Sequence, residues 1–233
     1  MAEFEGSVAI VTGASSGIGR ATAELLAREG ARVAIFARSG DKLRDIAGRH
    51  DRMMAVVGDA ADEEAMKQLV ATTEKRFGPC DILINNAGMI DPDPLTDTSP
   101  ERWDRMFAVN VRSAFLGCRL VLPSMMKRGS GAIVNVSSIS GVPGPDKFPG
   151  WVSYCASKAA VISMTEALAV EVKKSGVRVN CVSPGSVDTE MWARASGGAP
   201  ASMTAEEVAE TIAYLASPRS RPVNGQNIHV YSS

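Results

Sequence analysis

Seven short apolar runs alternate along the chain with longer stretches of helical periodicity. The runs cover residues 8–11, 32–36, 54–57, 82–84, 132–136, 177–182 and 228–231. This alternation is typical of βαβ units, whose strands are parallel. The runs are apolar throughout, as expected for strands that helices cover on both faces. The sequence therefore predicts an α/β fold, a single doubly wound domain over residues 1–233 with a seven-stranded, mostly parallel sheet.

Charge, cysteine and histidine usage narrow the functional classes. Lys and Arg number 25 and Asp and Glu 26, so neither a nucleic acid nor a membrane is an expected partner. The four cysteines form no Cys-x-x-Cys pair and the two histidines are isolated, so no metal site is expected. The N-terminus lacks the basic character of a signal peptide, and no apolar run reaches the roughly 18 residues of a membrane span. We expect a cytoplasmic protein.

Two helical stretches, residues 101–126 and 152–174, carry apolar residues around most of their circumference. A helix that is apolar all round is buried on more than one side. We expect these helices to form a subunit interface, with a thick monomeric core as the alternative.

A glycine-rich turn, Thr12-Gly13-Ala14-Ser15-Ser16-Gly17-Ile18-Gly19, joins the first apolar run to a helix expected over residues 20–29. Glycines at such a junction permit a tight turn and let a pyrophosphate approach the helix N-terminus. The spacing is G-x-x-x-G-x-G and not G-x-G-x-x-G. A purely structural turn is the alternative, but the strand and helix on either side favour a dinucleotide site.

The end of the second run indicates which dinucleotide is bound. A carboxylate at this point would accept the ribose 2′-OH of NAD. The chain has Ala37 and then Arg38, whose guanidinium can bind a phosphate with two hydrogen bonds. NADP(H) is therefore favoured over NAD(H), with a merely solvated Arg38 as the alternative.

Tyr154 and Lys158 stand four residues apart at the start of a helical stretch, on one face of the helix. A free phenol has a pKa of about 10 and exchanges protons poorly at neutral pH. A neighbouring ammonium, together with the positive ring of an oxidised nicotinamide, would lower the pKa of Tyr154 and make it a general acid/base. Taken alone, such a pair is common on helices, and a structural role is the alternative.

Further motifs follow the later strands in a fixed order. They are Asn85-Asn86-Ala87-Gly88, Asn110 within the long helix, Ser137-Ser138, and Pro184-Gly185 with Thr189 beyond it. With the glycine turn and the Tyr-x-x-x-Lys pair, the chain resembles the classical short-chain dehydrogenase/reductase family over residues 7–231. The resemblance implies a Rossmann-type fold and hydride transfer between NAD(P) and a carbonyl or secondary alcohol.

The resemblance also implies roles for particular residues. Tyr154 would exchange a proton with the substrate oxygen, which Ser138 would steady. Lys158 would hold the nicotinamide ribose, and Asn110 would order a water that relays protons to Lys158. The implied cofactor contacts are Gly13, Ser15, Ser16, Gly17, Ile18, Gly19, Arg38, Asp59, Ala60, Asn86, Ala87, Gly88, Tyr154, Lys158, Pro184, Gly185, Val187 and Thr189. The expected substrate contacts are Ser138, Ser140, Trp151, Tyr154, Met191 and Trp192.

Three segments depart from the family pattern. The segment between Ser138 and Tyr154 is longer than usual and rich in proline, and the lid segment over residues 190–203 is short. We expect a pocket that is open on the lid side, with specificity set mainly by the loop over residues 142–151 and a preference for a substrate with an apolar body. Residues 229–233 also differ from the family pattern.

The sequence thus predicts an NADP(H)-dependent ketoreductase or alcohol dehydrogenase with Tyr154 as general acid/base. An NAD-dependent polyol or sugar dehydrogenase is the alternative. A non-catalytic dinucleotide-binding regulator is a weaker one, because such a protein has little use for four intact catalytic positions. The expected assembly is a homotetramer, with a homodimer as the alternative.

Overall fold

The computed structural model describes residues 2–231 and contains all seven predicted strands. They are β1 (Val8–Thr12), β2 (Arg32–Ala37), β3 (Met53–Val57), β4 (Ile82–Asn85), β5 (Gly131–Val136), β6 (Val177–Pro184) and β7 (Asn227–Val230). The sheet has the order β3-β2-β1-β4-β5-β6-β7, and every pairing is parallel. The predicted doubly wound sheet is confirmed. Of the departing C-terminal segment, residues 232–233 lie outside the described residues.

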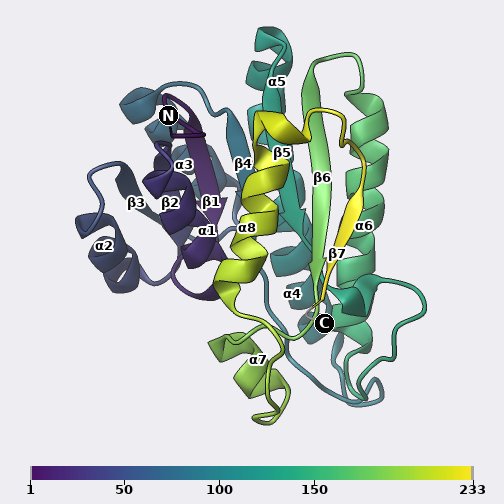
Figure 1. The fold of residues 1–233 in the computed structure, drawn as a ribbon. Coiled ribbons are helices and arrows are strands. Elements are labelled where there is room, and N and C mark those ends of the chain that lie inside the picture. Colours follow the sequence, from purple (N-terminus) through teal and green to yellow (C-terminus); the bar gives the residue numbers. More distant parts are fainter. Residues whose placement is uncertain (1, 232–233) are drawn as a thin grey trace.

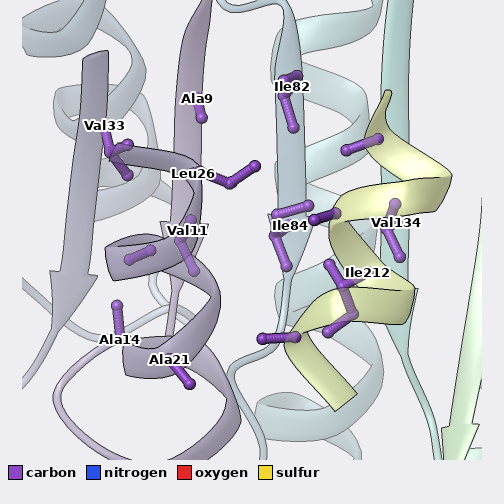
Figure 2. Close-up of a cluster of buried hydrophobic side chains, with 14 of the residues drawn as sticks. Ala9, Val11, Ala14, Ala21, Leu26, Val33, Ile82, Ile84, Val134 and Ile212 are labelled. Atoms are coloured by element: carbon purple, nitrogen blue, oxygen red, sulfur yellow. The ribbon is translucent and has the colours of Figure 1, made fainter. Parts of the chain in front are cut away.

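Helices cover both faces of this sheet (Figure 1). They are α1 (Gly17–Arg28), α2 (Gly40–Gly48), α3 (Glu63–Phe77), α4 (Pro100–Phe107), α5 (Ser113–Arg128), α6 (Val152–Glu171), α7 (Glu190–Ala195) and α8 (Ala205–Ala216). Helices α1 and α8 pack on one face, where Leu26 and Ile212 meet the strand residues Val11, Ile84 and Val134 (Figure 2). Helices α3, α5 and α6 bury their apolar residues against the other face.

The first long helical stretch is continuous from Pro100 to Arg128, with a π-helical turn, Ala108–Arg112, between α4 and α5. Its 29 residues, with a mean hydropathy of 1.2 over the most apolar window, are long and apolar enough to cross a membrane. Buried residues of α5 such as Leu116 and Val121 pack against the sheet, as in the core helix of a folded domain, which has the same length and composition.

Each of the two apolar helices also leaves large apolar side chains exposed. Phe115 and Met126 on α5 are 48% and 46% exposed, and Val152 and Val170 on α6 are 46% and 74% exposed. A thick monomeric core would bury these side chains, so the structure does not support that alternative. The subunit interface remains a prediction.

A chain of hydrogen bonds runs through the otherwise apolar core behind the sheet. The Asn85 amide on β4 donates to Asn135 Oδ1 on β5 at 2.8 Å, and the Asn135 amide donates to Thr165 Oγ1 on α6 at 2.9 Å. Thr165 in turn donates to the backbone oxygen of Val161. We call Asn85, Asn135 and Thr165 the amide chain; it links two central strands to the helix that carries Tyr154.

Candidate active site

A cleft of about 410 Å³ opens at the ends of β1, β2, β4 and β5. The sheet order reverses between β1 and β4, and ligands of doubly wound sheets bind at such a switch point. Of the predicted cofactor contacts, those that line the cleft are Gly13, Ser15, Ser16, Gly17, Ile18, Arg38, Asp59, Ala60, Asn86, Ala87, Gly88, Tyr154, Lys158 and Thr189. The cleft therefore collects residues from the whole length of the predicted nucleotide site.

The glycine turn packs directly on the segment after β4. Gly13 has a φ of 66°, and a Cβ there would lie 2.8 Å from Ala87 Cα. The Asn86 amide donates to the backbone oxygens of Thr12 and Gly13 at 3.0 and 3.1 Å. A Cβ on Gly19 would overlap this amide. Gly19, predicted as a cofactor contact, does not line the cleft; it is needed for this packing.

Helix α1 begins at Gly17, three residues before the predicted start, because the turn itself forms the first helical residues. Ser16 occupies the N-cap position, and in the described part of the chain its side chain makes no capping hydrogen bond. The first backbone N–H groups of an α-helix have no partner within the helix and attract anions. The N-terminus of α1 can therefore accept a pyrophosphate.

Basic residues gather at the far end of the cleft. Arg38 and Lys42 both line it, and Lys42 Nζ lies 3.2 Å from a carboxylate oxygen of Glu190 on α7. Arg194 also lines the cleft from α7. Sequence reasoning missed Lys42 and Arg194. Lys42 could have been found, because it stands in the first turn of the helix that follows β2, close in the chain to Arg38.

Asp59, one of the predicted cofactor contacts, follows β3 at the wall of the cleft. Its carboxylate accepts a hydrogen bond from the Ala61 N–H at 2.9 Å and pairs with Arg105 at 3.0 Å. Burial raises the pKa of Asp59, but these two hydrogen bonds and the positive charges of Arg105 and Arg38 together lower the net pKa. The carboxylate is therefore ionised and already engaged by α4.

Tyr154 and Lys158 lie in the first turns of α6 and are 8% and 4% exposed. Lys158 Nζ lies 5.8 Å from the centroid of the Tyr154 ring and donates to the backbone oxygen of Val136 at 2.9 Å. Ser137 Oγ donates to the backbone oxygen of Lys158 at 2.7 Å. These bonds fix the start of α6 against the end of β5.

The pKa of Tyr154 differs from the expectation. Burial raises the pKa of Tyr154 to about 12, although the Ser138 hydroxyl lowers it. Burial also lowers the pKa of Lys158 to about 8. The protein's own groups therefore do not produce the expected fall in the pKa of Tyr154, because burial outweighs the hydrogen bond with Ser138.

Asn110 lies in the π-helical turn, a feature that is frequent at functional sites. Its side-chain oxygen accepts from the Met89 N–H at 2.7 Å, and its amide donates to the Met89 backbone oxygen and to Ser157 Oγ. Both the oxygen and the nitrogen of the Asn110 side chain are therefore hydrogen-bonded within the protein. By these contacts Asn110 positions the segment after β4 against α6, and the ordered water that the resemblance implies stays a prediction.

A second cavity of about 390 Å³ adjoins the cleft, and Tyr154 lines both. All six predicted substrate residues line it, together with Pro184, Gly185 and Val187, which were predicted to contact the cofactor. Asp146 and Phe148 line it from the predicted specificity loop, and residues that sequence reasoning missed are Ile90, Ile139, Ser186 and Ala195. We call it the substrate cavity.

The short lid segment contributes more than expected. It forms helix α7, whose N-cap Thr189 accepts a hydrogen bond from the Trp192 N–H at 3.2 Å. The Trp192 ring meets Trp151 edge to face, with centroids 6.4 Å apart. Trp192 thus packs across from the lid onto the loop over residues 142–151. That the pocket is open on the lid side and that this loop mainly sets specificity stay predictions.

Comparison with known proteins agrees with this geometry. Residues 7–198 match the family model described as short chain dehydrogenase. The chain is 40% identical over 219 residues to an uncharacterized oxidoreductase of Staphylococcus saprophyticus, covering 92% of each chain. It is 42% identical over 192 residues to the 2-(R)-hydroxypropyl-CoM dehydrogenase of Xanthobacter autotrophicus, covering 79% of this chain and 76% of that one.

Comparison with solved structures agrees with this family. The 3-ketoacyl-(acyl-carrier-protein) reductase of Brucella melitensis, solved in complex with NADH, matches with a TM-score of 0.90 and 32% identity over 97% of each chain. Members of this family bind a nicotinamide dinucleotide. The chain therefore belongs to the short-chain dehydrogenase/reductase family and is a dehydrogenase/reductase that acts on CH–OH groups.

Proposed function

We propose that the protein is an NADP(H)-dependent oxidoreductase that interconverts a ketone and a secondary alcohol, with Tyr154 as the general acid/base. The observation that carries this proposal is the position of Tyr154, which lines both the nucleotide cleft and the substrate cavity. A phenol at this junction can exchange a proton with a substrate oxygen beside the nicotinamide. Ser138 and Lys158 stand next to it with the chemistry that the exchange needs.

The cleft residues fit a nicotinamide dinucleotide. The uncapped N-terminus of α1 suits the pyrophosphate, and the left-handed conformations of Gly13 and Gly17 keep side chains out of its way. Lys158 Nζ and Asn110 Oδ1 would each lie 3.4 Å from a Cβ placed on Gly88. A glycine there leaves room beside Lys158 for a ribose.

In the proposed mechanism the bound dinucleotide supplies or accepts the hydride. During ketone reduction, Tyr154 gives its phenolic proton to the carbonyl oxygen, to which Ser138 also donates a hydrogen bond. The ammonium of Lys158 stabilises the phenolate that remains. Because burial raises the pKa of Tyr154 to about 12, this phenolate depends on nearby positive charge at neutral pH.

Arg38 and Lys42 support the choice of NADP(H). Both line the end of the cleft beyond β2, where a carboxylate would bind the free 2′-OH of NAD. Their two positive charges suit a 2′-phosphate. The alternative is an NAD-dependent polyol or sugar dehydrogenase, and the NADH bound to the Brucella reductase keeps it open.

Tyr154→Phe tests the mechanism, because it removes the exchangeable proton and keeps the ring. We expect kcat for NADPH-dependent ketone reduction to fall by about 10²–10⁴, the usual contribution of a general acid. The Kd of NADPH, measured by fluorescence titration, should stay within about twofold. A variant that retains more than about a tenth of the wild-type kcat would remove Tyr154 from this role.

We also propose that residues 1–233 form one domain and that the protein is a homotetramer, with a homodimer as the alternative. The exposed apolar side chains of α5 and α6 support this assembly. Self-complementary patches of this kind pair across a two-fold axis.

A further inference from the structure

Aromatic side chains form one continuous wall of the substrate cavity. Phe148 and Trp151 precede α6, and their ring centroids are 4.7 Å apart. Trp192 of α7 lies 6.2 Å from Phe148 and 6.4 Å from Trp151, in both cases edge to face. Trp151 also meets the Tyr154 ring edge to face at 5.6 Å. We call Phe148, Trp151 and Trp192 the aromatic wall; it reaches from the cavity mouth to the proposed general acid/base.

The described residues that line the cavity offer no positive charge to a substrate. Among the described residues that line it, Asp146 is the only Asp, Glu, Lys, Arg or His side chain, and it is exposed. The nearby Lys147 donates to the backbone oxygens of Ile139 and Val142 at 3.2 and 2.5 Å, so its ammonium holds the loop together. Burying an anionic group here without a partner is costly. The cavity is therefore suited to an uncharged molecule.

Hydroxyl groups line the cavity, and the Ser138 hydroxyl hydrogen-bonds with Tyr154. Ser138 and Ser140 both line it and are 8% exposed. At the wall, the indole N–H of Trp192 already donates to the backbone oxygen of Ala199 at 2.8 Å. A polyol lying along this wall would lose hydrogen bonds to water, whereas one carbonyl oxygen beside Tyr154 and Ser138 would be satisfied.

We propose that this site takes an uncharged aryl ketone, or the corresponding aryl carbinol, with its ring on the aromatic wall. The proposal rests on the ketone reductase function proposed above. In the reducing direction the carbonyl carbon gains a hydride from NADPH and the oxygen gains a proton from Tyr154, giving the alcohol and NADP⁺. Edge-to-face packing favours a planar ring, because the positive edge of one ring lies against the negative face of the next. A saturated ring of the same size gains the burial but not this geometry.

Three ketones that share a methyl carbonyl group test the proposal. They are acetophenone, cyclohexyl methyl ketone and 4-acetylbenzoate, each assayed with NADPH for kcat/KM. We expect acetophenone to exceed cyclohexyl methyl ketone by about threefold to tenfold, the contribution of one aromatic pair. We expect 4-acetylbenzoate to fall at least about a hundredfold below acetophenone, because its carboxylate finds no partner.

Trp192→Leu should bring the ratio of kcat/KM for acetophenone and cyclohexyl methyl ketone to about one. Trp103→Leu is the matched control, since Trp103 stacks on Phe107 of α4 and does not line the cavity; it should keep the wild-type ratio. Phe148→Leu, at a side chain that is 52% exposed, provides a second test if Trp192→Leu does not fold.

The outcomes separate this inference from the proposed function. If the ketones are reduced without a preference for acetophenone, or if 4-acetylbenzoate is the best of the three, the inference is overturned and the proposed function stands. If no ketone is reduced, calorimetric titration of NADP⁺-loaded protein with 1-phenylethanol and 1-cyclohexylethanol decides. If 1-phenylethanol binds more tightly than 1-cyclohexylethanol and Trp192→Leu abolishes this difference, the aromatic site is supported and the proposed function is overturned. If the two alcohols bind equally, both are overturned.

Discussion

Replacing the buried ammonium of Lys158 should change how stability depends on pH. Lys158 is 4% exposed, and burial lowers its pKa from 10.5 to about 8. At 1.36 kcal/mol per pH unit, the difference between 10.5 and about 8 corresponds to about 3 kcal/mol of stability lost at neutral pH by keeping the buried group charged. Lys158→Met removes the charge and keeps a long side chain. It also removes the hydrogen bond to Val136, worth about 1.5–3 kcal/mol.

The sign of the pH dependence follows from the two pKa values. The unfolded chain binds more protons than the folded one between about pH 8 and 10.5, so the wild type gains stability as pH rises through this window and loses it as pH falls. Lys158→Met has no such group. We expect the variant to be at least as stable as the wild type at pH 7. Between pH 7 and 9.5, the free energy of unfolding of the wild type should rise by about 2 kcal/mol relative to that of the variant.

Urea unfolding of the cofactor-free proteins at pH 7, 8.5 and 9.5 measures this difference. Groups that titrate alike in both proteins cancel when the two free energies of unfolding are subtracted. Lys127→Met, at an exposed position on α5, is the control and should follow the wild type at all three pH values. A difference between wild type and Lys158→Met that does not change with pH would refute the reasoning.

Three further predictions concern the cofactor, the glycine turn and the assembly. Arg38→Asp should weaken NADPH binding about tenfold or more and improve NADH binding, because a charge-assisted contact worth ~1.5–3 kcal/mol becomes a repulsion; an unchanged ratio of the two Kd values would show that Arg38 points elsewhere. Gly19→Ala should destabilise the protein by about 1–3 kcal/mol in thermal unfolding, because its Cβ would lie 2.5 Å from the Gly13 oxygen, whereas Gly48→Ala, with no atom of residues 2–231 within 4 Å of the new Cβ, should not. Light scattering at micromolar concentration should give about four times the 24.5 kDa subunit mass, and a mass of one subunit would contradict the proposed interface.

The strands and the glycine turn could be predicted because their signals are local. Strands buried on both faces must be apolar along their whole length, and left-handed turn positions such as Gly13 require glycine. The motifs that carry the resemblance follow successive strands along the chain. Because the strands are parallel, the sheet brings these motifs together at the carboxyl ends of the strands. Fourteen of the predicted cofactor contacts line the cleft for this reason.

The missed features depend on contacts between distant residues. Lys42 and Glu190 lie 148 positions apart, and no pattern in the sequence predicts their contact. The docking of Trp192 on Trp151 likewise follows from the path of the lid, which a count of its apolar residues did not reveal. The raised pKa of Tyr154 reflects its burial, and burial depends on how all the surrounding segments pack.

The amide chain helps to determine the register between β4 and β5. Ile82, Leu83 and Ile84 of β4 could pack almost equally well against several positions of β5, since apolar contacts have little directionality. The observed register sets Asn85 opposite Asn135. A slip by one residue would turn one amide to the opposite face and leave buried donors unpaired, at a cost of about 1–3 kcal/mol for each. The two amides thus select one pairing of β4 with β5. The hydrogen bond from Asn135 to Thr165 then aligns β5, which leads to Ser138, with α6, the helix that carries Tyr154.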